Sequence, residues 1–482
     1  SKYALQVKEI GNKFYKERDF ENALVYYSKA IDFKKDCVFY ANRAACYVSL
    51  GQNEKVFDEC TKALELDPTY TKAITRRALA YESIGQYEKA LIDYSSAATL
   101  QLYRQESTVT SCERALKLLT QEKVKELSKD RKFRLPSKSF ISAYMESFCE
   151  TSRGINKILS MGTEKEGDVL LQSAFTAIQK KEWEEAYKCV KNAKESGKFS
   201  KEWEDLSYNL SATFDFIVGD NENAMININK ALEIAPERIS SIIKRAAIHM
   251  ERGEFQEAVG GYESAVKIGT TDSDAHYHYA QFLILQEKVE YAIAEYKKAI
   301  ELDDSFLFAH IQLGVSHYKN RDVASSMQVF ERAIRKFKDN SVIYNYFGEL
   351  CLDLQNFDKA LENIEKSIEL DPSSPLPYIN KAMLYLQWKN DVETAKDLCK
   401  KAIEVDPLSD VAWTQLGQLE THSLDFEKAI DCYKHSLELV RSDVDLTNII
   451  TILELAKAQS HVHKTYPDAI KKIQNIVSSG QQ

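Results

Sequence analysis

Glycine and proline are scarce in this sequence, whose 482 residues include 16 glycines and 8 prolines. The sequence also lacks stretches of alternating apolar and polar residues between turn signals, which are typical of half-buried β-strands. Both absences argue against a sheet-rich fold. We therefore expect an almost purely helical protein.

Cysteine pairs and long apolar runs are missing as well. The nine cysteines include no CxxC pair, and several fall on helix faces where small residues pack, which favours a reduced, cytosolic environment. No run of about 18 apolar residues occurs, so this chain is not expected to span a membrane. It also begins without methionine, and we expect a preceding segment, such as a membrane anchor, that this sequence does not include.

Signatures of catalysis and metal binding are absent too. There is no phosphate-binding glycine loop, HExxH or GxSxG motif, and no nucleophile with an evident base. His276 with His278, and His461 with His463, form HxH pairs, but residues two apart on a helix point about 200° from each other and cannot readily chelate one ion. We therefore expect no enzyme activity, no metal and no cofactor.

The sequence does contain a 34-residue repeat, which is clearest at residues 273–306. Ala280, Ala292 and Ala299 occupy its positions 8, 20 and 27, the pattern of the tetratricopeptide repeat. Two amphipathic helices, roughly 274–286 and 289–302, should pack antiparallel, and the small alanines allow their backbones to approach closely.

The residue at position 20, an alanine in nine of the units, recurs at nearly regular intervals along the chain and defines eleven units. Intervals from Ala224 to Ala429 are 34 residues, apart from one of 35 whose extra residue falls in the turn at 389–391. Each unit buries its apolar stripe against its neighbours. The pattern predicts an all-α tetratricopeptide-repeat superhelix, or α-solenoid, of about eleven repeats in two modules. The position-20 residues are Ala23, Val56, Ala90, Ala186, Ala224, Ala258, Ala292, Ser326, Ala360, Ala395 and Ala429.

The repeat is interrupted between the third and fourth units. Residues 107–131 are expected to form one helix that continues from the third unit, Pro136 prevents an uninterrupted helix, and 160–168 is polar and resembles a turn or hinge. The expected parts are a three-repeat module at 1–103, a helical linker and hinge at 104–168, an eight-repeat solenoid at 169–441 and capping helices at 442–482.

Charge is unevenly distributed over these parts. Residues 1–103 carry 15 basic and 14 acidic groups, 104–140 carry 10 and 5, and 141–482 carry 39 and 54. An acidic carboxy-terminal array argues against nucleic acid as a partner and favours basic or positively amphipathic partners. An acidic surface could equally serve solubility.

Five polar residues stand on the first helices of the first three units. Lys8 and Asn12 are four residues apart and share a helix face, as do Lys72 and Arg76, and Asn42 lies on the helix between them. In a right-handed stack these first helices line the concave side. Three cations and two amides can all donate to closely spaced carboxylates, such as a free chain terminus beside an Asp side chain. The alternative is a merely solvated face.

These residues, in GNKFY, YANRA and KAITR, resemble the dicarboxylate clamp of tetratricopeptide adaptors that hold the terminal Glu-Glu-Val-Asp of cytosolic heat-shock chaperones. Over essentially the whole chain, the clamp module, a basic helix ending in DRKFRLPSKSFISAYMESF and eight further repeats resemble the tetratricopeptide import receptors of the mitochondrial outer-membrane translocase. LYLQWKND at 384–391 and DAHYHYAQFLIL at 274–285 are similar as well.

That resemblance implies a receptor on the mitochondrial outer membrane that faces the cytosol. It would dock chaperone tails, bind mitochondrial preproteins, especially carrier-type membrane proteins, and work with other translocase subunits. The amino-terminal membrane anchor of such receptors is not in this sequence. Two other functions stay open: a soluble cytosolic co-chaperone adaptor with the same clamp, and the substrate-selecting solenoid of an enzyme, for which residues 440–482 are too few to supply a catalytic domain.

Residues at the same repeat positions as the clamp residues are predicted to line a groove in the later units. Apolar and aromatic side chains alternate there with amides and one carboxylate, which suits an amphipathic or extended hydrophobic segment with some basic residues. Several of the apolar ones could instead pack between helices. The candidates are Tyr277, His278, Gln281, Ile311, Gln312, Val315, Asn345, Tyr346, Glu349, Ile379, Asn380 and Met383.

Overall fold

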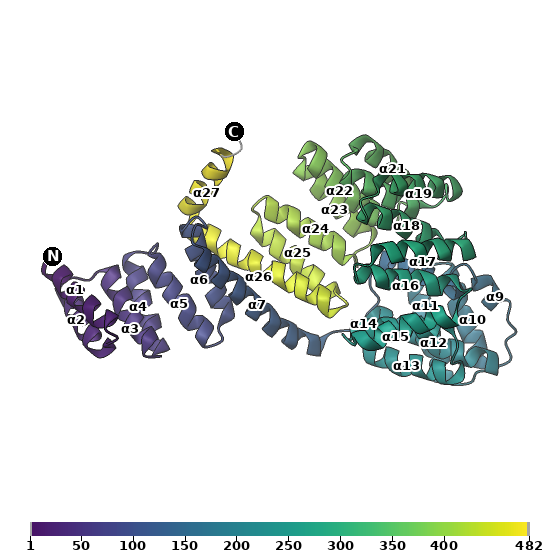
Figure 1. Ribbon diagram of the computed structural model, residues 1–482, viewed down its shortest axis with the longest axis horizontal. Helices are drawn as coiled ribbons and strands as arrows, with labels where there is room; N and C mark the ends of the chain where they lie inside the picture. Colours follow the sequence, from purple (N-terminus) through teal and green to yellow (C-terminus); the bar gives the residue numbers. More distant parts are fainter. Residues whose placement is uncertain (1, 480–482) are drawn as a thin grey trace. The chain divides into compact units, whose positions relative to one another are not determined.

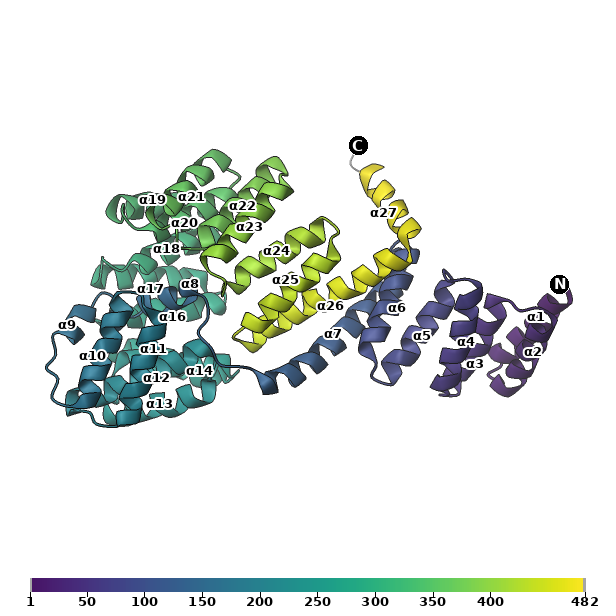
Figure 2. The ribbon, with the colours of Figure 1, turned by 180° about the vertical axis from the view of Figure 1, so that it is seen from behind.

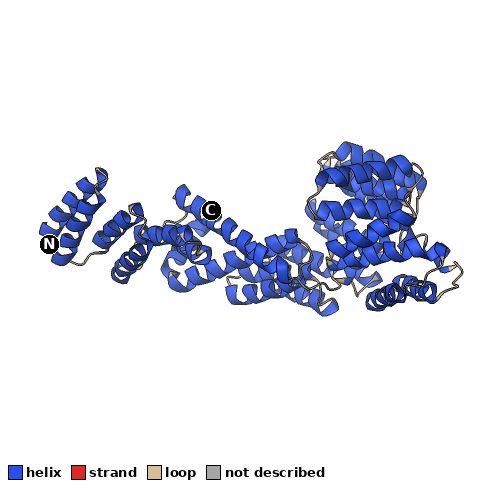
Figure 3. Ribbon diagram, turned by 90° about the horizontal axis from the view of Figure 1, so that it is seen from below, coloured by secondary structure: helices blue, strands red, loops and turns tan. Residues whose placement is uncertain are grey.

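The computed structural model describes residues 2–479, and every regular element in that range is a helix (Figures 1 and 3). The helices expected at 274–286 and 289–302 are α16 (Ser273–Leu285) and α17 (Val289–Leu302). Ala280, Ala292 and Ala299 are fully buried in them. The prediction of an all-α tetratricopeptide-repeat fold is confirmed.

Each unit turns sharply between its two helices at position 15. Gly51 and Gly85 have φ angles of 68° and 76° there, a left-handed conformation that glycine adopts without steric cost. Position 15 is left-handed in all the other units too, although most of them place a larger residue there, such as Glu287 with φ 60°. The turn geometry therefore belongs to the repeat and does not depend on glycine.

Contacts divide the chain into two compact units, residues 1–131 with 420–434 and 443–482, and residues 132–419 with 435–442. The helices of the first unit are α1 (Lys2–Lys16), α2 (Phe20–Phe33), α3 (Cys37–Ser49), α4 (Asn53–Leu66), α5 (Thr71–Ser83), α6 (Tyr87–Leu100), α7 (Glu106–Leu127), η1 (Ser128–Asp130), α26 (Asp443–Thr465) and α27 (Pro467–Ser479).

The second unit contains the longer array of repeats. Its helices are α8 (Lys138–Glu146), η2 (Cys149–Thr151), α9 (Ile155–Leu159), α10 (Glu166–Gln179), α11 (Trp183–Ser196), α12 (Lys201–Val218), α13 (Asn221–Ile234), α14 (Ile239–Glu251), α15 (Phe255–Ile268), α16, α17, α18 (Leu307–Lys319), α19 (Val323–Lys336), α20 (Ser341–Asp353), α21 (Phe357–Leu370), α22 (Leu376–Lys389) and α23 (Val392–Val405). The division passes through the eleventh repeat, α24 (Asp410–His422) and α25 (Phe426–Leu439).

Helices α7 and α26 extend the first unit beyond its three repeats. Helix α7 is separated from α6 by a turn in which Leu102 and Tyr103 have φ angles of 53° and 55°, so it does not continue the third repeat without a break. Helix α26 packs against α6 and α7 (Figures 1 and 2), where Ala458 joins the core around Leu119. The division by contacts thus differs from the expected domain limits, and a capping role for 442–482 toward the last repeat stays a prediction.

Residues 137–160 pack into the second unit although they precede its first repeat. Phe148 is 1% exposed and lies in a core cluster with Ile243 and Tyr262. Tyr144 packs against Phe216 at 5.3 Å between ring centroids. Much of the expected linker is therefore part of the array's interior.

Candidate functional site

The five residues predicted to form the clamp lie where the repeat pattern places them. Lys8 and Asn12 are on α1, Asn42 is on α3, and Lys72 and Arg76 are on α5. Their side chains are half-buried except that of Lys72, which is exposed. All five belong to the first helices of three successive repeats in one compact unit.

Hydrogen bonds connect several of these groups across the three repeats. The Asn12 Oδ1 atom accepts hydrogen bonds from the Tyr27 hydroxyl at 2.7 Å and from Asn42 Nδ2 at 3.4 Å. The Arg76 Nη1 atom donates to the Ala41 carbonyl at 2.7 Å. The structure therefore brings Asn12 and Asn42 together and fixes Arg76 against the helix that carries Asn42.

A glycine beside Asn12 makes room for the tyrosine that orients it. A Cβ atom built on Gly11 would lie 2.8 Å from Tyr27 Cε1, closer than two carbon atoms can approach. The small residue in the GNKFY motif thus lets the Tyr27 hydroxyl reach Asn12. The sequence analysis identified Asn12 but not the hydrogen bond from Tyr27 that orients it.

Glu9 is a further member of the site that the sequence analysis missed. Its carboxylate accepts hydrogen bonds from Lys8 Nζ and, at 3.0 Å, from Asn12 Nδ2. These bonds, first that from Lys8, lower the pKa of Glu9. An internal carboxylate therefore engages two of the donors that a ligand carboxylate would need. The signal was available, because Glu9 directly follows Lys8 and lies three residues before Asn12.

The groove residues of the second unit fall into two groups. Those at position 5 of their repeats, Tyr277, Ile311, Asn345 and Ile379, are at most 5% exposed, so they pack inside the array. Those at positions 6 and 9 are half-buried or exposed: His278, Gln281, Gln312, Val315, Tyr346, Glu349, Asn380 and Met383. The prediction of a ligand-facing surface now rests on the second group.

Two neighbouring repeats do bring groove residues together. Asn380 Nδ2 donates to Asn345 Oδ1 at 3.0 Å, and the amide of Asn380 also faces Glu349, whose pKa is raised by burial. Gln415 Nε2 donates to the sulfur of Met383 at 2.9 Å. The ninth repeat therefore contacts the tenth through Asn345 and Asn380, and the tenth contacts the eleventh through Met383 and Gln415.

At the seventh repeat the chain covers its own groove. The His278 ring stacks on Phe148 at 4.4 Å, and its Nε2 atom donates to the Ser147 carbonyl at 3.1 Å. The Arg153 guanidinium lies 3.5 Å from the centroid of the Phe306 ring and pairs with Asp274 at 2.5 Å. Sequence reasoning placed His278 in an open groove and did not foresee this cover.

Burial gives His278 a testable pH response. It lowers the pKa of His278 to about 3, whereas an unfolded histidine titrates near about 6.5. Below about pH 6.5 the unfolded chain binds a proton at this histidine that the folded chain does not. The free energy of unfolding should therefore fall by up to about 1.4 kcal/mol for each unit by which the pH is lowered.

A His278→Gln variant retains an N–H donor without titrating, and its free energy of unfolding should fall less steeply between about pH 7 and about pH 5. Urea unfolding across this range measures the slopes. The control is His422→Gln, which makes the same replacement at an exposed position away from the segment that covers His278. Equal slopes for His278→Gln and the parent chain would contradict the assignment.

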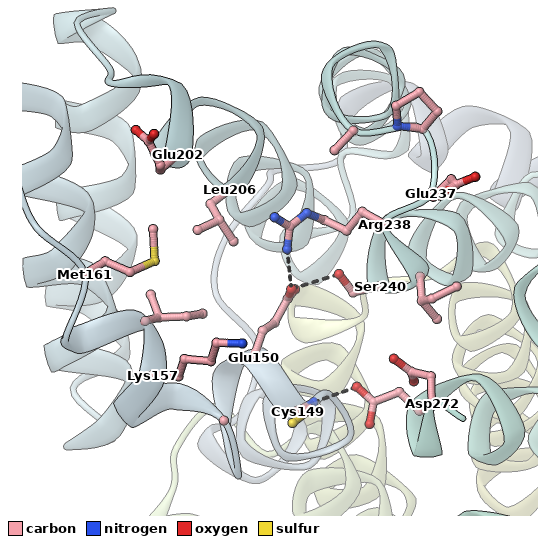
Figure 4. Close-up of a pocket in the computed structure, with 16 residues that line it drawn as sticks. Cys149, Glu150, Lys157, Met161, Glu202, Leu206, Glu237, Arg238, Ser240 and Asp272 are labelled. Carbon is pink, nitrogen blue, oxygen red and sulfur yellow. Dashed lines mark hydrogen bonds and ion pairs between the residues drawn. The ribbon is translucent and has the colours of Figure 1, made fainter. Parts of the chain in front are cut away.

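A pocket of about 940 Å³ lies beside this internal segment (Figure 4). Glu150 sits at its centre, where its carboxylate accepts a hydrogen bond from Ser240 Oγ at 2.8 Å and forms an ion pair with Arg238 at 3.7 Å. Two basic residues, Lys157 and Arg238, face five carboxylates in its wall. The carboxylates are Glu150, Glu202, Glu237, Asp272 and Asp274, and the apolar wall contains Ile158, Met161, Leu206, Ala235, Pro236 and Ile239.

Comparison with known proteins identifies the family. Residues 59–92, 273–306 and 311–375 match models of the tetratricopeptide repeat. The mitochondrial import receptor subunit TOM70 of Rattus norvegicus is 30% identical over 494 residues, which cover 96% of this chain and 80% of that protein. The chain belongs to the TOM70 family.

Other TOM70 proteins give the same result. The Saccharomyces cerevisiae subunit is 30% identical over 520 residues, covering 99% of this chain and 83% of the relative. The crystal structure of yeast Tom70 has 29% identity and a TM-score of 0.58, over 98% of this chain and 99% of that one. The similarity to TOM70 extends over both compact units of the chain, and so over the five candidate clamp residues and the longer array.

Within residues 2–479, none of the helices combines the length and the apolar character that a bilayer crossing requires. Across that part of the chain, no three His, Cys, Asp or Glu side chains gather as a metal site.

Proposed function

We propose that this chain is the cytosol-facing part of a mitochondrial outer-membrane import receptor, non-enzymatic, that docks chaperone tails and receives their preprotein clients. Similarity to TOM70 import receptors along nearly the whole chain carries this proposal. A soluble co-chaperone adaptor would share the clamp alone, whereas the similarity includes the long second array. Other translocase subunits would then take over the client.

The clamp of Lys8, Asn12, Asn42, Lys72 and Arg76 is the docking site in this proposal. Cations and amide N–H groups bind carboxylates through charge-assisted hydrogen bonds. A free chain terminus beside an Asp side chain, as in Glu-Glu-Val-Asp, presents two such carboxylates together. The bonds that join Asn12 to Asn42 and Arg76 to Ala41 support this, because they preorganise the donors.

The test is the affinity of the full chain for a fluorescent peptide that ends in Glu-Glu-Val-Asp. The same peptide with an amidated terminus serves as the comparison, since amidation removes one carboxylate and nothing else. Micromolar binding of the free peptide and much weaker binding of the amidated one are expected. Equal binding of the two peptides would refute docking through the clamp.

Removing the internal competitor should strengthen this binding. A Glu9→Gln variant no longer holds Lys8 and Asn12 with a charge, so the affinity for the free peptide should rise about two- to fivefold. Fluorescence anisotropy with the same peptide measures it. Glu17→Gln makes the same change of net charge at an exposed residue of the turn after α1, so an equal gain there would show a general charge effect instead.

For the client we propose the pocket beside the internal segment together with the groove residues at positions 6 and 9 of the eighth to tenth repeats. Lys244 and Arg153 already neutralise Glu150 and Asp274. The exposed Glu202 and Glu237 beside the apolar wall are free to complement a preprotein segment that is apolar on one side and basic on the other. Carrier-type membrane proteins, with long apolar stretches, are the expected clients.

Reversing two charges tests this client site. Glu202 and Glu237 line the pocket and are exposed, so Glu202→Lys with Glu237→Lys should leave the fold intact and reduce retention of a carrier-type precursor about tenfold. A pull-down with the full chain measures retention. Glu233→Lys, on the exposed side of α13, is the control. Unchanged retention by the double variant would exclude the pocket.

A further inference from the structure

A second cavity lies between α5 and α7 in the first compact unit and shares residues with the clamp. It has a volume of about 380 Å³ and is lined by the first three turns of α5, the end of α6 and the first half of α7. Lys72 and Arg76 stand in its wall. A ligand held by these two clamp residues therefore has an open space beside it.

The cavity is basic and polar. Lys72, Arg76 and Arg114 line it, no Asp or Glu does, and most of the other lining side chains carry hydroxyl or amide groups. This composition is opposite to that of the acidic pocket in the second unit. An acidic peptide suits it, because each carboxylate would meet cations and hydroxyl donors.

Arg114 is held in place in the wall of this cavity. Its Nε and Nη2 atoms donate to the two oxygens of Glu82, at 2.6 and 3.0 Å, and Nη2 also lies 3.3 Å from Ser111 Oγ. Glu82 in turn accepts a hydrogen bond from Tyr94 at 2.9 Å. The side chain of Arg114 is nevertheless 47% exposed, so the fixed guanidinium still presents an edge to the cavity.

Gln101 contributes an unused acceptor. Its Oε1 atom is buried in the cavity wall and accepts no hydrogen bond from any residue that the structure describes. A buried carbonyl without a donor is destabilising. Rotation of the Gln101 side chain toward the cavity would uncover this atom, and a backbone N–H of a peptide lying there would then supply the donor.

The spacing along α5 indicates which peptide residue reaches Arg114. Glu82, to which Arg114 is bound, follows Arg76 by six residues, or about 9 Å along a helix axis. An extended peptide covers this distance in about three residues. The residue three positions before a terminal Asp held near Arg76 would thus approach Arg114. In Glu-Glu-Val-Asp that residue is the first glutamate.

We propose that this cavity extends the clamp and binds the acidic residues upstream of the terminal carboxylates, with Arg114 facing the first glutamate and Gln101 accepting a backbone N–H. The inference rests on the proposed function, because it places the same peptide. It assigns Arg114 and Gln101 to recognition of the tail, beyond the five clamp residues.

The experiment compares two fluorescent peptides with free termini, one ending in Glu-Glu-Val-Asp and one in Gln-Glu-Val-Asp, on the full chain and on Arg114→Gln. The glutamine peptide should bind the parent chain about fivefold more weakly. On Arg114→Gln the two peptides should bind alike. An undiminished preference in that variant overturns the inference, as does equal binding of both peptides to the parent chain.

A second variant keeps the test decisive if Arg114→Gln folds poorly. Ser107 is exposed on the cavity rim, in the first turn of α7, where an acidic residue is favourable for a helix. Ser107→Glu should weaken binding of the Glu-Glu-Val-Asp peptide more than binding of the Gln-Glu-Val-Asp peptide. An equal loss of affinity for both peptides would count against the cavity. The amidated peptide separates this inference from the proposed function. Loss of binding on amidation supports docking through the clamp, whatever the comparison of the glutamate and glutamine peptides shows.

Discussion

Replacing Arg76 with alanine should weaken binding of the Glu-Glu-Val-Asp peptide by about 10- to 100-fold. A hydrogen bond to a charged group contributes about 1.5 to 3 kcal/mol, and each 1.4 kcal/mol changes an affinity about tenfold. Arg76 is fixed through Nη1 to the Ala41 carbonyl, so its remaining donors are oriented before a ligand arrives. Fluorescence anisotropy of the labelled peptide measures the loss.

Lys13 offers the matched control for this prediction. It is exposed on the same helix as Lys8 and Asn12, and Lys13→Ala removes one positive charge without touching the clamp. The control variant should bind within about twofold of the parent chain. Similar losses in both variants would mean that net charge, and not the clamp, governs binding.

The largest effect on stability is expected from Glu150→Gln. Lys244 is 2% exposed, and its Nζ atom donates to Glu150 Oε1 at 2.6 Å and to Asn209 Oδ1 at 2.7 Å. Removing the carboxylate leaves a buried ammonium without a counter-ion, which costs about 3 to 5 kcal/mol. Urea unfolding monitored by circular dichroism measures the free energy of unfolding.

A double variant distinguishes the charge from the packing. Glu150→Gln combined with Lys244→Met removes both charges, and most of the lost stability should return. Glu202→Gln removes a carboxylate from the same pocket at an exposed position, and its expected effect is within about 0.5 kcal/mol. If the double variant were as unstable as Glu150→Gln, the buried pair would not be the cause.

The repeats, and the placement of the five proposed clamp residues on three successive first helices, were predictable because they follow from local patterns. A recurring small residue every 34 positions fixes where two helices must touch, and α16 and α17 begin and end within one residue of the prediction. Lys8 with Asn12, and Lys72 with Arg76, needed only the four-residue spacing of a helix face.

The groove was harder to predict because position 5 changes its environment along the array. Lys8 occupies this position in the first repeat and is half-buried, whereas the equivalent Ala41 and Ile311 are fully buried. Transferring the clamp positions to later repeats therefore placed packed residues among the ligand-facing candidates.

The internal segment was beyond local reasoning for a different reason. Glu150 meets Lys244 across 94 residues of sequence, and no periodicity connects the two positions. Nothing near His278 in sequence indicates that Phe148 stacks on it. Only the three-dimensional path of residues 137–160 shows that the chain fills part of its own inner face.

The packing of α26 on α6 and α7 has a consequence during synthesis of the chain. Lys123 pairs with Glu454 at 2.8 Å across 331 residues, and Ala458 covers the core around Leu119. Since a chain emerges from the ribosome in order, the apolar surface of α7 stays uncovered until almost the whole chain has been made. Three repeats can fold early from local contacts, but their compact unit is completed last.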